Sequence, residues 1–62
     1  MAATFKDFDG YETYEVDLVE DIDTNYDIIS NKTTGYFVII NDNKIEVSKE
    51  VYEKIKEIRN FD

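Results

Sequence analysis

The clearest pattern of apolar and polar positions lies in the last third of the chain. Residues 36–40 read Tyr-Phe-Val-Ile-Ile, the aromatic and β-branched composition of a strand, and residues 44–47 alternate between polar and apolar side chains. The residues 41–43 between them, Asn-Asp-Asn, tolerate the positive φ angles of a tight turn. This arrangement predicts a β-hairpin.

The position of the turn decides which residues face each other in this hairpin. A two-residue turn at 42–43 sets Ile40 opposite Ile45 and Val38 opposite Val47. These four apolar side chains then share one face of the sheet, and the polar residue between Ile45 and Val47 points to the other face.

The residues after the hairpin have the spacing of an amphipathic helix. Val51, Ile55 and Ile58 recur at intervals of three and four residues, which places them on one helical face. Ser48 precedes them and has the short hydroxyl that accepts a backbone N–H bond at a helix start. We predict a helix over 49–60 whose apolar face packs on the hairpin.

The first half of the chain has weaker patterns. Apolar and acidic residues alternate around 14–19, which is typical of a strand with one buried and one wet face, and 26–30 forms a second short run. Residues 31–35, which end in Gly35, supply the turn that leads into the hairpin. Residues 1–10 are expected to form a flexible arm or a single helical turn.

Together these patterns predict an α+β fold with a single domain over residues 1–62. A chain of 62 residues has room for one domain only. The expected architecture is a small antiparallel β-sheet of three to four strands with one C-terminal α-helix packed on it. The expected elements are strands at about 11–19, 26–30, 36–40 and 44–47, and a helix at 49–60.

Composition removes several classes of function. The chain has no Cys and no His, so disulfide bonds and the usual zinc ligand sets are excluded. Its longest apolar run, residues 36–40, is far shorter than the ~20 residues of a membrane-spanning helix, and the first residues lack the basic and apolar segments of a signal peptide. We expect a cytoplasmic protein with no membrane contact.

The net charge of −8 belongs to one half of the chain. Residues 28–62 carry six acids and six bases, which cancel, whereas residues 1–27 carry nine acids and one base. Nucleic acid and anionic membranes are not expected as direct ligands, because the proteins that bind them carry Lys and Arg patches. A basic partner is expected instead.

Acidic pairs also suggest chemistry, since two carboxylates can act as general acid and base. Such carboxylates need a concave, partly desolvated setting, and a chain of this size has little volume to build one. The lack of His removes the conventional catalytic triad. We expect a protein that is not an enzyme and that has no cofactor.

One segment resembles the start of a calcium-binding loop. Asp21, Asp23 and Asn25 match the first three ligand positions of an EF-hand. The sixth position is Tyr26, where the loop requires Gly, and the twelfth is Lys32, where it requires a bidentate Glu. We therefore expect a solvated acidic loop without a metal, and a weak cation contact is the alternative.

The acidic segment is the candidate binding surface. On a strand, Glu15 and Asp17 would project from one face about 6.6 Å apart, and the following acids would continue the row into a loop. A groove lined with Lys and Arg accepts such a row as it accepts a phosphate backbone. The expected partner-binding residues are Glu12, Tyr14, Glu15, Asp17, Glu20, Asp21, Asp23 and Asp27. The alternative is an ordinary wet face that keeps the protein soluble.

Aromatic residues interleave with these acids. Phe5, Phe8, Tyr11 and Tyr14 recur every three residues. Two interpretations stay open for them: a cover for the core, or a contact surface in which Tyr side chains anchor a partner.

The segment from Tyr36 to Tyr52, YFVIINDNKIEVSKEVY, resembles a hairpin-to-helix element of small phage and mobile-element proteins from low-GC Gram-positive bacteria. In its size, its acidity and its lack of enzyme motifs, the chain also resembles anti-CRISPR proteins and other inhibitors of host defence, some of which mimic DNA. The resemblance covers less than a third of the chain. It implies a partner in the host bacterial cytosol, such as a CRISPR effector or nuclease.

The sequence leads to two functional hypotheses. In the first, the protein is a non-enzymatic inhibitor that places an acidic, DNA-mimicking surface in the basic groove of a nucleic-acid-binding protein or ribonucleoprotein. In the second, it is a small phage or mobile-element interaction or regulatory module, with a homodimer left open, whose acidity serves solubility.

Overall fold

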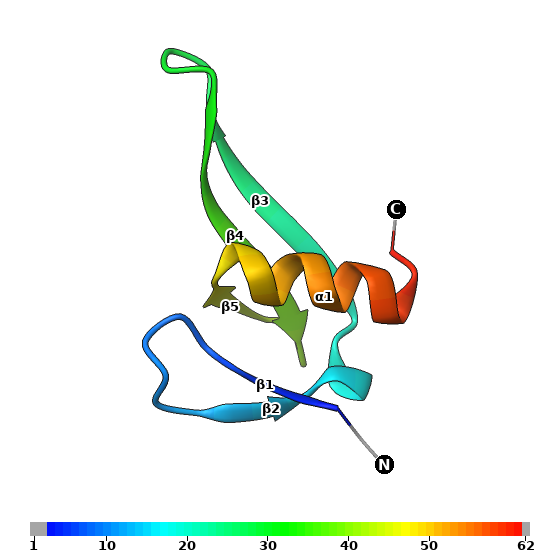
Figure 1. Cartoon of the computed structure of the whole chain (residues 1–62). Helices are drawn as coiled ribbons and strands as arrows, with labels where there is room; N and C mark the ends of the chain where they lie inside the picture. The colour runs from blue at the N-terminus through cyan, green and yellow to red at the C-terminus, as the bar shows by residue number, and fades with distance from the viewer. Residues whose placement is uncertain (1–2, 62) are drawn as a thin grey trace.

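The computed structural model describes residues 3–61 and has an α+β fold (Figure 1). Its elements are β1 (Thr4–Lys6), β2 (Thr13–Glu15), the 3₁₀ helix η1 (Val16–Leu18), β3 (Asp21–Asp27), β4 (Lys32–Ile40), β5 (Asn43–Val47) and α1 (Lys49–Arg59). β1 and β2 form one antiparallel sheet, and β3, β4 and β5 form a second sheet in that order. The predicted fold class is confirmed, although the strands divide into two sheets.

The hairpin predicted in the last third of the chain is β4 and β5, but its turn lies one residue earlier than expected. Asn41 and Asp42 have φ angles of 52° and 64°, the positive values that a type I′ turn requires at both central positions. Val38 therefore pairs with Ile45 and not with Val47. The predicted register is wrong by two residues, so the apolar side chains still share one face.

Helix α1 begins and ends close to the predicted positions. The Ser48 hydroxyl accepts the backbone N–H of Val51 at 3.3 Å, as the sequence predicts for an N-cap. At the other end, Asn60 adopts the left-handed conformation with φ 59° and closes the helix.

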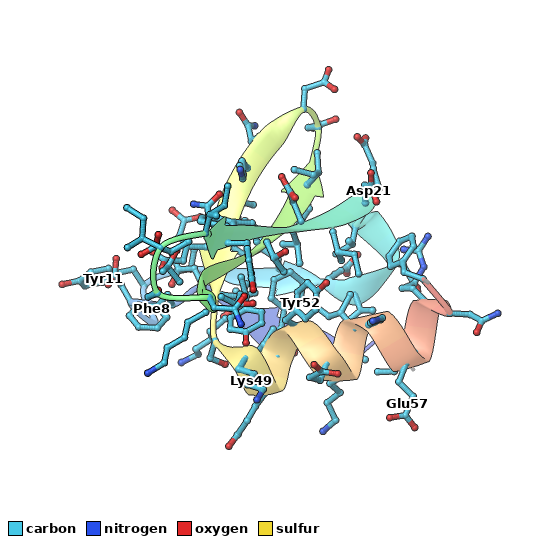
Figure 2. The ribbon with its side chains drawn as sticks, turned by 90° about the horizontal axis from the view of Figure 1, so that it is seen from above. Phe8, Tyr11, Asp21, Lys49, Tyr52 and Glu57 are labelled. Atoms are coloured by element: carbon cyan, nitrogen blue, oxygen red, sulfur yellow. The ribbon has the colours of Figure 1, made fainter. Side chains whose placement is uncertain are left out.

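The core lies between α1, the three-stranded sheet and β1. Its buried side chains are Phe5, Val16, Val19, Val38, Val47 and Ile55. Tyr52 of α1 packs on Tyr36 of β4 with ring centroids 5.1 Å apart. Figure 2 shows Tyr52 pointing toward the sheet, whereas Lys49 and Glu57 point away from it. The helix thus buries one face, as its apolar spacing predicts.

The strand predicted at 11–19 is present only as β2. The chain leaves the extended conformation after Glu15, because η1 turns Val16 and Val19 inward, where both are almost fully buried. In a strand, two residues three positions apart point to opposite faces, so both cannot be buried on one face. In one turn of 3₁₀ helix they point to the same side.

The N-terminal segment also differs from the prediction of an arm or a helical turn. Residues 4–6 form β1, in which Phe5 lies opposite Tyr14 of β2 and is buried. Burial of the Phe5 ring favours this strand over a free arm, because a free arm would leave the ring in water. Residues 1 and 2 of the predicted arm lie outside the described residues.

The strand predicted at 26–30 is wrong beyond Asp27, where β3 ends. The Asp27 carboxylate accepts hydrogen bonds from the N–H of Ile29 and the hydroxyl of Ser30, both at 3.0 Å. These local bonds favour a turn over a continuing strand. Figure 1 shows the resulting β3–β4 hairpin extending well away from α1, and the molecule measures 41 Å along its longest axis.

Candidate partner-binding surface

The structure divides the predicted partner-binding residues between two segments. Glu12, Tyr14, Glu15 and Asp17 lie in or beside β2 and η1, whereas Glu20, Asp21, Asp23 and Asp27 lie in or beside β3. The predicted row of Glu15 and Asp17 along one strand face is wrong, because η1 interrupts the extended backbone between them. Asp21 and Asp23 do share a face, since side chains alternate along β3.

Arg59 fixes the bend between these two segments. Its Nη1 donates to the backbone carbonyl oxygens of Val16, Asp17 and Val19 at 2.9, 2.9 and 2.8 Å. A cationic donor strengthens hydrogen bonds of this kind. The contact joins residues about 40 positions apart, so nothing in the local sequence pattern predicts it; the one available signal is that Arg59 is the only arginine in the chain.

Four acids surround this bend and are termed the acidic turn: Glu15, Asp17, Glu20 and Asp21. All four side chains are exposed. Among residues 3–61 the one ion pair joins Lys44 to Asp23, so no carboxylate of the acidic turn forms an ion pair, and the Arg59 guanidinium in the bend binds backbone carbonyls instead. The buried valines and the N–H of Glu20, which donates to the Ile39 carbonyl at 2.7 Å, hold the backbone beneath these carboxylates.

Of the predicted partner-binding acids, Asp23 is the one that forms an ion pair within the described residues. Its Oδ1 accepts the N–H of Thr24 at 2.8 Å, and its Oδ2 lies 3.3 Å from Nζ of Lys44. The Thr24 hydrogen bond, followed by Lys44, holds the pKa of the Asp23 carboxyl below its usual value. Asp21 likewise accepts the N–H of Ile22 at 2.8 Å but has no ion-pair partner, so the contact with Lys44 makes Asp23 less available to a basic partner than the acidic turn.

Phe37 and Gly35 explain how Lys44 is placed. A Cβ atom at residue 35 would lie 3.0 Å from the Phe37 ring, so the ring occupies space that only glycine leaves. On this outer face of the sheet, Nζ of Lys44 lies 4.5 Å from the ring centroid. Gly35 was expected in a turn, but it lies inside β4, beside a β-bulge opposite Asn25 and Tyr26.

Tyr14 and Asp27 have structural roles among the predicted binding residues. Tyr14 stacks on Phe5 with ring centroids 5.6 Å apart and an interplanar angle of 29°. Partial burial raises the pKa of Tyr14 above its ordinary value, and the carboxylates of Glu12 and Asp7 raise it further. The Asp27 carboxylate holds the turn after β3 through two hydrogen bonds. It is therefore less available to a partner than a carboxylate without such bonds would be.

The aromatic series divides in the same way. Phe5 and Tyr14 cover the core, whereas Phe8 and Tyr11 are exposed in the loop between β1 and β2. Figure 2 shows Phe8 and Tyr11 together at one end of the molecule and Asp21 at the other. Neither interpretation of the series, core cover or contact surface, therefore describes all four rings.

The EF-hand resemblance does not produce a loop. Asp21, Asp23 and Asn25 lie along the extended strand β3. Neighbouring side chains on one face of a strand are about 6.6 Å apart, so their oxygens do not converge on one cation. In the described part of the chain, no group of three or more acidic, His or Cys side chains is arranged to hold a metal ion.

The sequence patterns also missed Ile28 and Ile29, which are exposed at the end of the β3–β4 hairpin. The signal was present, since the two isoleucines lie between Asp27 and Ser30-Asn31, all of them turn-forming residues. Their β-branched side chains favour a strand, and for that reason the sequence predicts one at these residues.

Comparisons with known proteins identify no relative of this chain. No protein-family model matches the chain, and neither the search of curated proteins nor the search of solved structures found a match. Within residues 3–61, no helix has the length and apolar character needed to cross a bilayer.

Proposed function

We propose that this protein is a non-enzymatic inhibitor that binds the basic groove of a nucleic-acid-binding protein or ribonucleoprotein in the cytoplasm. The acidic turn carries the proposal, because it places four exposed carboxylates on a backbone that Arg59 and two buried valines hold in place. No basic side chain of the described residues pairs with them.

Electrostatics supports a basic partner. The four carboxylates outnumber the single Arg59 guanidinium in the bend and repel one another in the free protein, and a groove lined with Lys and Arg relieves that repulsion. The same field speeds the encounter with a positive surface and disfavours direct binding to nucleic acid. The resemblance to anti-CRISPR proteins makes a host defence effector or nuclease the expected type of target.

The test is capture of targets from a nuclease-treated bacterial lysate on the immobilised protein and on two variants. The first variant neutralises the acidic turn with Glu15→Gln, Asp17→Asn, Glu20→Gln and Asp21→Asn. The matched control changes four exposed acids elsewhere to Gln: Glu46, Glu50, Glu53 and Glu57. Both variants therefore have the same net charge, and circular dichroism checks that both keep the fold.

We expect the wild type and the control to retain the same nucleic-acid-binding protein, and the first variant to bind it roughly ten- to a hundredfold more weakly, since exposed ion pairs each contribute up to ~1 kcal/mol. Binding should weaken with added salt, because screening sets in within about 8 Å at physiological ionic strength. Unchanged binding of the first variant would support the alternative, in which the acidity serves solubility, and equal loss in both variants would show that net charge and not the acidic turn drives binding.

A further inference from the structure

The end of the β3–β4 hairpin, residues 27–32, is termed the tip and presents two isoleucines to solvent. Ile28 is 86% exposed and Ile29 is 97% exposed, although isoleucine is among the residues most often buried. The turn that carries them is held by the Asp27 carboxylate and by the Tyr26 hydroxyl, which donates to the side-chain oxygen of Asn31. A held turn loses little conformational entropy when it docks.

A groove of about 700 Å³ lies between β1 and α1, on another part of the molecule. The nearly buried Phe5, Val16 and Ile55 lie at its base, and Ile58, which is 51% exposed, contributes apolar surface on its helix side. The charged residues of its lining have both signs: Lys49, Glu50, Glu53, Lys54 and Glu57. The groove is thus apolar inside and mixed in charge at its rim.

The backbone of β1 adds hydrogen-bonding groups beside this groove. The N–H of Val16 donates to the carbonyl of Ala3, and the N–H of Asp7 donates to that of Glu12. In an antiparallel pair the backbone N–H and C=O groups of successive residues point alternately toward the partner strand and away from it. The N–H and C=O of Thr4 therefore face away from β2. Thr4 lines the groove, and Figure 1 shows β1 on the helix side of β2.

We propose that the tip of one copy docks in this groove of a second copy, and that the exchange is reciprocal and closes a dimer. Ile28 and Ile29 supply the apolar part of the contact. Lys32 lies beside them, and the rim offers Glu side chains that can pair with it. A closed pair of this kind has two identical contacts related by a two-fold axis.

The distribution of charge favours a second copy as the occupant. The tip from residue 28 onward and the whole of α1 belong to residues 28–62, in which six acids and six bases cancel. The lining residues of the groove that come from the acidic half, Ala3, Thr4, Phe5 and Val16, carry no side-chain charge, so two copies can meet at this contact with little repulsion between the contacting surfaces. The proposal does not depend on the proposed inhibitor function, since it uses different residues.

Sedimentation velocity over a range from micromolar to millimolar protein tests the dimer. The wild type should change from the 7.3 kDa monomer to twice that mass as its concentration rises. A tip variant, Ile28→Ser with Ile29→Ser, and a groove variant, Ile58→Asn, should each weaken the dimer about 100-fold or more, because each contact then loses buried apolar surface. Tyr11→Ser, at a site 87% exposed and outside both surfaces, is the control and should behave as wild type.

Mixing the two variants separates tip-to-groove docking from other dimers. A mixture retains one intact contact, made by the tip of the groove variant and the groove of the tip variant, so it should form more dimer than either variant alone. The chain has no Cys, so Ile29→Cys and Ile58→Cys proteins should form an intermolecular disulfide when mixed and oxidised, faster than either protein does alone.

Added salt should leave this dimer unchanged or strengthen it, because the contact is apolar and each copy carries a net charge of −8. Capture of a basic partner should show the opposite dependence, so failure of one proposal is distinguishable from failure of the other. A protein that stays monomeric up to millimolar concentration overturns the proposal. A dimer that depends on the tip but not on Ile58, or loss of partner capture in the tip variant with wild-type sedimentation, also overturns it.

Discussion

Nη1 of Arg59 lies 2.8 Å from the carbonyl oxygen of Val19, in the bend that precedes β3. The same nitrogen also bonds the carbonyls of Val16 and Asp17 at 2.9 Å each. The last turn of α1 is thus tied to the bend of the chain that carries the acidic turn. A side chain far away in sequence therefore holds the backbone of the bend around which the four acids lie.

Arg59→Met should lower the free energy of unfolding by about 2–3 kcal/mol, because hydrogen bonds from a charged donor to three carbonyls are lost. Urea unfolding followed by circular dichroism measures this change. Lys54→Met removes the same charge from an exposed position of α1 and should change stability by less than about 0.5 kcal/mol. Equal effects of the two substitutions would show that only helix charge matters at residue 59.

Asp23 should contribute to the pH dependence of stability. Its pKa is lowered in the folded protein, by the Thr24 N–H first and by Lys44 next, whereas the unfolded chain titrates near the usual value of about 3.9. The contribution is therefore complete above the unfolded pKa and is lost as the pH falls through the folded pKa. Urea midpoints measured from neutral pH into acid should fall less for Asp23→Asn than for the wild type. Parallel curves for the two proteins would contradict the assignment.

The turn between β4 and β5 gives a prediction that separates the observed register from the expected one. Asp42→Gly should stabilise the protein by roughly 0.5–1 kcal/mol, because glycine adopts positive φ without strain. Asn43→Gly should destabilise it by a similar amount, since residue 43 is the first residue of β5. Thermal unfolding of both variants is the measurement. A turn at 42–43 would instead make both substitutions stabilising.

The sequence predicts the β4–β5 hairpin and α1 well because both depend on local patterns. Ser48 caps the helix through a residue three positions away, and the strand composition of 36–40 is unambiguous. The register was missed because three consecutive residues, 41–43, all tolerate positive φ.

The first half of the chain could not be predicted because its structure depends on distant contacts. Phe5 becomes part of a strand by packing into a core that residues from four other elements complete. The bend at η1 depends on Arg59. The acidic residues themselves are visible in the sequence, but no local pattern predicts the bend between Glu15 and Asp21 or the pairing of Asp23 with Lys44.

The measurement that tests the central claim most directly is a competition between this protein and nucleic acid on the captured target. Fluorescence anisotropy of a labelled nucleic acid bound to the purified target is followed as the protein is added. The acidic-turn proposal predicts complete displacement by the wild type, and roughly ten- to a hundredfold more protein for the same effect with the four-residue neutralised variant. A labelled nucleic acid that stays bound while the protein saturates the target would contradict it.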